Sequence, residues 1–203
     1  WFRVRRYAGS KDRAAVTSLV YQVLRQRGEL AWALSQAQSE NAHEPSARAL
    51  VIAALARVEG LSLDDLDAYF DGGQYGPACL TSEEKAVVAR LAAERGIGVA
   101  PDWVLGNYPQ ELDAQLRAGL GDNMVAEMAA MISRAPTDLR VNTLKADRGA
   151  AQASLDSDGI AADLTAMSLF GLRVRGRAPI AESAAFRSGM VEIQDEGAQI
   201  ATF

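Results

Sequence analysis

The sequence predicts an α+β protein, in which an all-α bundle precedes a small α+β module. In roughly the first two thirds of the chain, apolar residues recur every three or four positions, which is the spacing of one helix face. After Pro136 the apolar residues alternate with polar ones, as at Leu139, Val141 and Thr143, which is the spacing of a strand. This change of period places the boundary between the two parts near residue 135.

Helix start and stop signals divide the first part into helices. Ser62 with Asp65, and Thr81 with Glu84, have the spacing of capping boxes. Gly28 is expected to end the first helix, because glycine commonly follows the last helical turn. The helices are expected to begin near residues 10, 30, 45, 62 and 81, with shorter ones around 102–108, 110–120 and 123–133.

The second part alternates short strands with short helices. Asp147 is placed to cap a helix that Gly159 closes. Further strands are expected at residues 161–166, 171–176 and 190–195, with a helical turn over 181–188 and the first turns of another helix over 196–203.

Composition limits the chemistry that the chain can carry. Its single cysteine, Cys79, excludes an intrachain disulfide, and with one histidine it cannot build a Cys/His zinc site, so we expect no metal. A reducing cytoplasm suits this cysteine usage.

No apolar run approaches the roughly 18 residues of a membrane span, so we expect no membrane partner. Because the first residue is Trp1 rather than methionine, we expect these 203 residues to be a piece of a longer protein.

The net charge of −5 is distributed unevenly. Residues 1–27 carry seven basic side chains against one acidic, whereas residues 28–133 carry six basic and sixteen acidic ones. Residues 134–177 are basic again, with seven against five. The basic amino end can contact phosphates or form a solvated arm, and charge alone does not choose between the two.

Three segments that could carry enzyme chemistry have simpler explanations in the sequence. GIGVAP at 96–101 follows a helix and enters a proline turn, whereas a phosphate-binding loop joins a strand to a helix. Asp64, Asp65 and Asp67 occupy the first turn of a helix, where carboxylates favour the helix dipole and the solvent. Cys79 precedes a helix cap, and packing explains it as well as reactivity does.

The segment DLRVNTLK, residues 138–145, is more informative. Arg140 and Asn142 share one strand face and Lys145 follows the strand, a grouping that suits phosphate and sugar contacts with an amide available for a base edge. An ordinary polar strand face explains the same spacing. Gln194 and Asp195 lead into a helix, and spacing alone gives them no catalytic role.

Three segments, taken in order, resemble a known family: PTDLRVNTLKAD at 136–147, GIAADLTAMSLFGLRVRG at 159–176 and AAFRSGMVEIQDEGAQIA at 184–201. They resemble the stretch ahead of the catalytic domain in bacterial ribosomal RNA 5-methylcytosine methyltransferases of the Sun/Fmu type, within the NOL/NOP/Sun family. GSKDRAAVTSLVYQVLR at 9–25 is similar to their helical domain, which has the fold of the antitermination factor NusB.

The resemblance implies a NusB-like RNA-binding domain over 1–134, a small α+β RNA-binding module over 135–192, and the start of a methyltransferase domain over 193–203. In that family a cysteine attacks C6 of cytosine, S-adenosylmethionine donates a methyl group to C5, and a second cysteine helps to release the product. Both cysteines and the cofactor loop belong to a Rossmann-like domain expected beyond Phe203. We therefore expect this piece to be inactive by itself and to bind no cofactor.

The resemblance also implies roles for individual residues. Gln194 and Asp195 match a motif that borders the cofactor and target-base cleft. The candidate RNA-binding residues, which combine the strand motif with the basic amino end, are Arg3, Arg5, Arg6, Arg140, Asn142 and Lys145.

The leading hypothesis is therefore the amino-terminal, RNA-positioning part of a cytoplasmic, S-adenosylmethionine-dependent rRNA (cytosine-5) methyltransferase. The alternative is a stand-alone RNA-binding or antitermination-type module without catalysis, against which the unfinished helix QDEGAQIATF speaks. A helical protein-interaction scaffold that uses the acidic segment 28–133 leaves the arginine-bearing strand unexplained.

Overall fold

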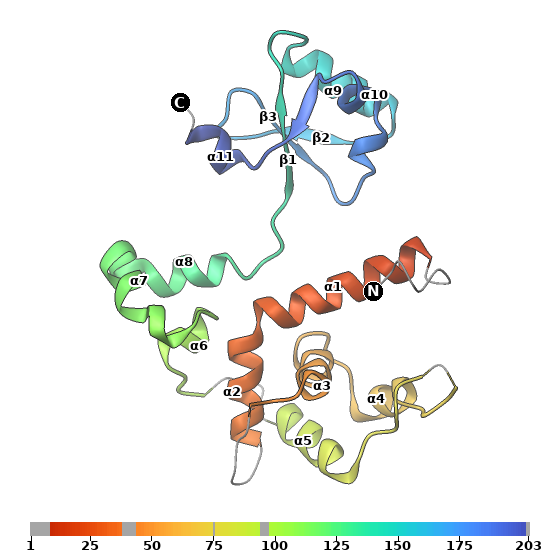
Figure 1. Ribbon diagram of the computed structural model, residues 1–203, viewed down its shortest axis with the longest axis vertical. Helices are drawn as coiled ribbons and strands as arrows, with labels where there is room; N and C mark the ends of the chain where they lie inside the picture. Colours follow the sequence, from red (N-terminus) through yellow and green to blue (C-terminus); the bar gives the residue numbers. More distant parts are fainter. Residues whose placement is uncertain (1–8, 38–43, 75, 94–97, 202–203) are drawn as a thin grey trace. The chain divides into compact units, whose positions relative to one another are not determined.

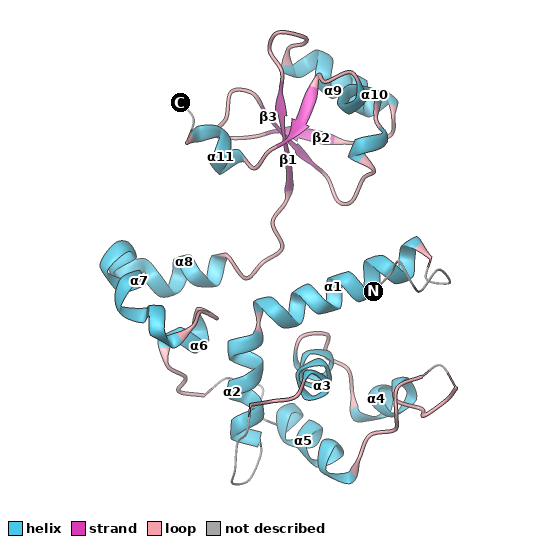
Figure 2. Cartoon of the chain, viewed as in Figure 1, coloured by secondary structure: helices cyan, strands magenta, loops and turns pink. Residues whose placement is uncertain are grey.

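The computed structural model describes residues 9–37, 44–74, 76–93 and 98–201. The chain divides into two compact units, unit 1 over Trp1–Ser133 and unit 2 over Arg134–Phe203. The described residues of unit 1 are helical and those of unit 2 combine helices with a sheet, so the α+β prediction is confirmed (Figures 1 and 2).

Unit 1 is held together by two apolar clusters. One lies among α1, α2, α3 and α5 and includes Leu30, Leu34 and Leu50; the other centres on Leu66 and Val88. The longer elements of this unit are α1 (Ser10–Arg25), α2 (Arg27–Ala37), α3 (Ala47–Arg57), α4 (Leu63–Tyr69), α5 (Ser82–Ala93), α6 (Asp102–Leu105), α7 (Asp113–Leu120) and α8 (Met124–Ala130). Two 3₁₀ turns, η1 (Gln110–Leu112) and η2 (Gly121–Asn123), flank α7.

Both predicted capping boxes are present in unit 1. The Ser62 hydroxyl accepts a hydrogen bond from the Asp65 amide at 3.1 Å, and the Asp65 carboxylate accepts from the Ser62 amide at 2.9 Å. Thr81 and Glu84 make the same reciprocal pair. These local rules succeed because every partner lies within one helical turn.

The expected stop at Gly28 is wrong. Gly28 lies in the first turn of α2, which begins at Arg27 only one residue after α1 has ended. The side chain of Asn107 accepts a hydrogen bond from the Glu29 amide at 2.9 Å, and a Cβ on Gly28 would lie 3.4 Å from that oxygen. A contact far along the chain therefore stabilises a helix start where the local pattern predicts an end.

Unit 2 has the order β1 (Thr137–Val141), α9 (Arg148–Ser157), β2 (Ala162–Leu164), β3 (Gly171–Val174), α10 (Ala184–Arg187), β4 (Val191–Ile193) and α11 (Glu196–Ile200), with the 3₁₀ turn η3 (Ile180–Glu182) before α10. The four strands form one antiparallel sheet in the order β2-β3-β1-β4. Each helix that joins two strands thus crosses over an intervening strand, which is the βαββαβ topology of a ferredoxin-like domain.

The two faces of this sheet differ. Leu139, Leu172 and Val191 point to one face and form a core with Ala151 of α9 and Ala185 of α10. The intervening residues of the strands point to the other face, here called the open face, which carries Asp138, Arg140, Asp163, Arg173 and Glu192. The amino end of α11 contacts β1 on the open face. The stretch predicted to begin a further domain, 193–203, thus packs within unit 2 as far as it is described, to Ala201.

Candidate functional site

A pocket of about 570 Å³ lies at the carboxyl end of β1. There the chain leaves the strand and turns, with the amides of Lys145 and Ala146 both donating to the carbonyl of Asn142. The pocket brings together the three candidate residues of the strand motif with residues from the loop before β3 and from the start of β4. Its walls include Arg140, Asn142, Lys145, Phe170, Gly189 and Glu192.

Arg140 lies on the open face at the edge of this pocket. Its guanidinium forms an ion pair with Glu192, the residue directly opposite on β4. Both side chains are about half exposed, so the pair is a surface contact that contributes little to stability. Because it is solvent-exposed, a phosphate can compete with the carboxylate for the arginine.

Asn142 and Lys145 hold the turn that precedes β4. The Asn142 amide nitrogen donates to the Gly189 carbonyl at 3.3 Å, and its oxygen accepts from the Leu144 amide at 3.1 Å. The Lys145 ammonium donates to the Ser188 carbonyl at 2.6 Å. The amide predicted to face a base edge is therefore engaged within the chain, whereas Lys145, whose ammonium has three donors, forms no ion pair with a described carboxylate.

Gly189 suits this turn chiefly because of its backbone conformation. Its φ of +71° lies in the left-handed region, which side-chain-bearing residues rarely adopt. A Cβ at this position would also lie 2.9 Å from the Lys145 ammonium. Because that contact involves the far end of a flexible side chain, the positive φ is the stronger reason for a glycine here.

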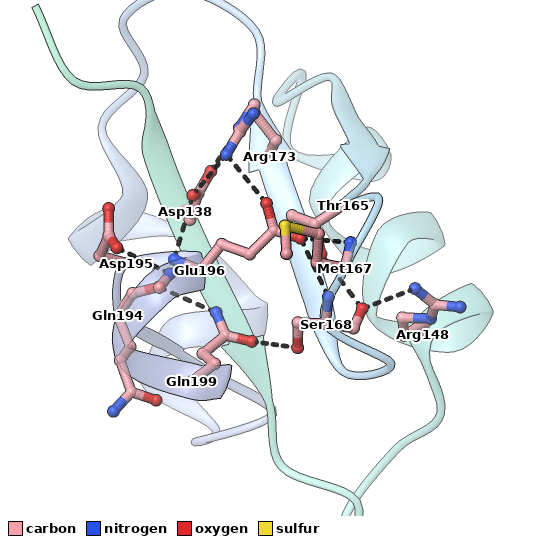
Figure 3. Close-up of polar contacts among 11 residues, drawn as sticks. Asp138, Arg148, Thr165, Met167, Ser168, Arg173, Gln194, Asp195, Glu196 and Gln199 are labelled. Atoms are coloured by element: carbon pink, nitrogen blue, oxygen red, sulfur yellow. Dashed lines mark hydrogen bonds and ion pairs between the residues drawn. The ribbon is translucent and has the colours of Figure 1, made fainter. Parts of the chain in front are cut away.

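A polar network joins the open face to α11 (Figure 3). Asp138 is buried and binds the guanidinium of Arg173 through two hydrogen bonds of 2.7 and 2.8 Å. The same carboxylate accepts from the Glu196 amide at 3.2 Å, at the first residue of α11. One buried carboxylate therefore fixes both a neighbouring strand and the start of a helix.

Glu196 extends this network to the loop between β2 and β3. Its carboxylate accepts hydrogen bonds from the amides of Met167 and Ser168 at 2.6 and 2.9 Å, and also contacts Arg173 (Figure 3). The Ser168 hydroxyl donates to the Gln199 side chain at 2.7 Å. α11 is thus pinned to the loop at its first and its fourth residue.

The carboxylates of this network stay ionised at neutral pH. The hydrogen-bonded Arg173 guanidinium lowers the pKa of Asp138, and the Glu196 amide lowers it further. The amides of Ser168 and Met167 lower the pKa of Glu196. Arg173, facing both carboxylates, has its own pKa raised, chiefly by Asp138.

Gln194 and Asp195 have structural partners in the same region. Asp195 caps α11 by accepting from the Gly197 amide at 2.8 Å. The Gln194 carbonyl accepts from the Gln199 side chain at 2.9 Å. The side-chain oxygen of Gln194 is buried and finds no hydrogen-bond partner among the described residues.

The open face itself is neutralised by ion pairs. Arg140 pairs with Glu192, Arg173 with Asp138, and Arg175 with Asp163. None of the four strands in the described part of the chain contains an aromatic residue. Ferredoxin-like sheets that read RNA on their face do so with exposed aromatic rings on which bases stack. The open face therefore lacks such stacking rings, whereas the pocket at the end of β1 is lined by Phe170.

Sequence reasoning missed Asp138, Arg173 and Glu196. The alternation that exposed Arg140 also places Asp138 on the open face, but the identity of its partner depends on which strand lies beside β1. Glu196 opens the helix predicted over 196–203, and only the tertiary structure shows its bonds to the β2–β3 loop.

The predicted RNA-binding residues Arg3, Arg5 and Arg6 lie outside the described residues, so their role stays a prediction. Cys79 is an exposed free thiol. Within the described ranges, no group of three or more His, Cys, Asp or Glu residues is placed to hold a metal ion. None of the described helices is long and apolar enough to cross a membrane.

Comparison with known proteins supports the ferredoxin-like reading of unit 2. Residues 108–181 match the ferredoxin-like domain family of RsmF/B-like methyltransferases. The matched segment begins within unit 1, at Tyr108. It ends at residue 181, after β3 and before β4. No curated protein matches the sequence.

Among solved structures, the chain is similar to the crystal structure of PH0851, with a TM-score of 0.51 and 16% sequence identity. The similarity covers 96% of this chain and 47% of that one, so the chain spans about half the length of PH0851. At this identity the likeness concerns the fold.

Proposed function

From the match of residues 108–181, we propose that this chain is the amino-terminal, RNA-positioning part of an S-adenosylmethionine-dependent rRNA (cytosine-5) methyltransferase of the cytoplasm. The observation that carries the proposal is the pocket at the end of β1. Most of its lining residues, 140–145 and Phe170, lie in the segment that matches a methyltransferase family, and it gathers Arg140 and Lys145 beside an aromatic ring. The helices of unit 1 would form a NusB-like domain that binds the same RNA.

The residues of unit 2 do not fit the cofactor. A loop for S-adenosylmethionine is glycine-rich and connects a strand to a helix in a parallel sheet. Neighbouring strands here are antiparallel, and the connection from β1 to α9, residues 142–147, contains no glycine. In this proposal the cofactor, the two cysteines and methyl transfer belong to a following domain, and this chain holds the RNA.

Lys145 and Arg140 would supply the phosphate contacts. Lys145 carries a charge that no described carboxylate neutralises, and Arg140 can exchange its exposed carboxylate partner for a phosphate. Each phosphate contact on a single strand releases counterions and adds about 0.7 to the slope of log affinity against log salt concentration.

The experiment is a titration of this chain with single-stranded RNA over a range of salt concentrations. The double variant Arg140→Ala/Lys145→Ala should bind more weakly and reduce the salt slope by about 1.4, the sum for two contacts. The matched control is Arg175→Ala/Lys85→Ala, which removes the same charges from pairs outside the pocket. A flat salt response, or equal losses in both double variants, would contradict RNA contact at this site.

A second experiment separates the enzyme from a stand-alone module. Reading the coding frame past Phe203 should reveal a glycine-rich loop after a strand and two cysteines, and the full-length protein should methylate cytosine in rRNA. A frame that ends near Phe203 would leave a non-catalytic RNA-binding module instead.

A further inference from the structure

The pocket at the end of β1 combines three kinds of chemistry within one cavity. Lys145 provides a cation, Asn142 an amide, and Phe170 a half-buried aromatic ring. Its volume of about 570 Å³ falls within the range of small-ligand sites, about 300–1,000 Å³. Such a combination suits one nucleotide better than a continuous helix, because a base can reach an aromatic ring only when it is unstacked.

Leu144 adds apolar surface to the same cavity. Its side chain is 95% exposed and lines the pocket, although it belongs to a turn whose backbone is fixed by Asn142. A base that enters the pocket would therefore cover apolar surface from Phe170 and from Leu144. Burial of such surface is favourable and independent of base identity.

The backbone around Phe170 keeps its position fixed relative to β1. Its carbonyl accepts from the Val141 amide at 2.8 Å, which continues the β1–β3 ladder into the pocket. Ser168, two residues earlier, is held by Glu196 and by Gln199. The polar network under α11 thus fixes the loop that carries the ring.

The positive charge of the pocket comes from Lys145, on a different segment of its wall from Phe170. The Lys145 ammonium donates one N–H to the Ser188 carbonyl, so two N–H groups are left to bind a phosphate. Arg140 and Glu192 neutralise each other, so Lys145 determines the sign of the local charge.

We infer that this pocket binds a single unstacked nucleotide of a single-stranded RNA segment, with its base against Phe170 and its phosphate on Lys145. The inference rests on the proposed function and adds to it a stacking residue and a preference for single strands. It also separates two contributions, since the lysine contact weakens with salt whereas the ring contact does not.

The test compares a short single-stranded RNA of mixed sequence with a blunt duplex of the same sequence. The single strand should bind more tightly, and Phe170→Leu should weaken its binding by at least about 5-fold while leaving the salt slope unchanged. Tyr69→Leu is the matched control, because Tyr69 is an aromatic residue of unit 1 with 63% exposure. Thermal unfolding of each variant checks that it is folded.

Photocrosslinking of the unchanged protein provides a measurement that needs no variant. RNA carrying 5-iodouridine should crosslink to the peptide that contains Phe170, because this base reacts with rings on which it stacks. Crosslinks confined to other peptides, or equal affinity for single strand and duplex, would overturn the pocket inference.

The two proposals fail in different ways. RNA binding that depends on Arg140 and Lys145 but not on Phe170 would leave the proposed function standing and remove the nucleotide pocket. Absence of binding to either RNA would remove both.

Discussion

Asp138 is a charged residue whose side chain is buried in unit 2. Its side chain is 1% exposed, whereas that of its partner Arg173 is 44% exposed. A buried carboxylate costs free energy unless it is fully hydrogen-bonded, and here Arg173 and the Glu196 amide supply the donors. Asp163 makes a similar two-point contact with Arg175 on the same face, but its side chain is 52% exposed. The two pairs therefore separate the effect of burial from that of the ion pair.

We predict that Asp138→Asn lowers the free energy of unfolding by about 1–3 kcal/mol, because the substitution removes a charge-assisted bond and leaves donors facing each other in a buried site. Asp163→Asn should change the unfolding midpoint little, since water replaces the lost contact. Chemical denaturation of the two variants measures the difference. Equal effects would show that burial of Asp138 does not matter.

The pH dependence of this difference gives a second measurement. Because the pKa of Asp138 is lowered in the folded protein, its stabilisation is complete above the unfolded value near 4 and is lost as pH falls through the lowered pKa. The gap in unfolding free energy between the wild type and Asp138→Asn should therefore narrow as pH drops from about 5 to 3. A gap that stays constant over this range would contradict the assignment.

At the scale of elements, the β2–β3 connection depends on the close packing of Gly171 against Thr165. A Cβ on Gly171, the first residue of β3, would lie 2.0 Å from the Thr165 hydroxyl. Thr165 is buried, and its amide donates to the Gly171 carbonyl at 3.1 Å. The same connection carries the amides of Met167 and Ser168 that bind Glu196. A side chain at position 171 would thus disturb the loop that holds α11.

We predict that Gly171→Ala destabilises the protein by about 1–3 kcal/mol, which is the usual cost of overpacking. Gly149→Ala is the matched control within unit 2, because Gly149 lies in α9 and its added Cβ would make only an ordinary contact of 3.4 Å with Asp147. That change should be neutral or stabilise the helix by up to about 1 kcal/mol. Urea denaturation of both variants tests this, and an unaffected Gly171→Ala would show that the loop can move aside.

For the whole molecule, each unit has its own apolar core. In unit 2 the core residues come from all four strands and from α9 and α10, and the ladder hydrogen bonds are made within the unit. A domain of about 70 residues is small but can fold alone when it has such a core. The family match nevertheless begins at Tyr108, ahead of the unit boundary.

We predict that a fragment of residues 134–203 folds by itself with a single cooperative thermal transition. Circular dichroism and amide exchange should show the protected strands β1 and β3. A fragment that begins at residue 108 serves as the comparison. If only the longer fragment unfolds cooperatively, the sheet requires the segment that precedes it.

The sequence by itself determined the α+β class, the change of period near residue 135, and the order of helices and strands. These features depend on neighbours within a few residues: the capping pairs of Ser62 and Thr81 and the Asp147 cap, which accepts from the Ala150 amide at 2.7 Å. Alternation likewise identified Arg140 as a residue of the polar strand face. Roles given to Arg140, Asn142 and Lys145 in RNA binding remain predictions.

The tertiary structure alone decided the partners. Strand order placed Arg173 beside Asp138, and the turn before β4 engaged Asn142 and Lys145. The distant Asn107 accepts a hydrogen bond in the first turn of α2, near the residue where local rules predict a helix end. The pocket with Phe170 exists because β1 lies between β3 and β4, which brings together segments about 30 and 50 residues apart in the chain. Local spacing cannot encode such pairings, because they depend on the register of strands and on the packing of the whole unit.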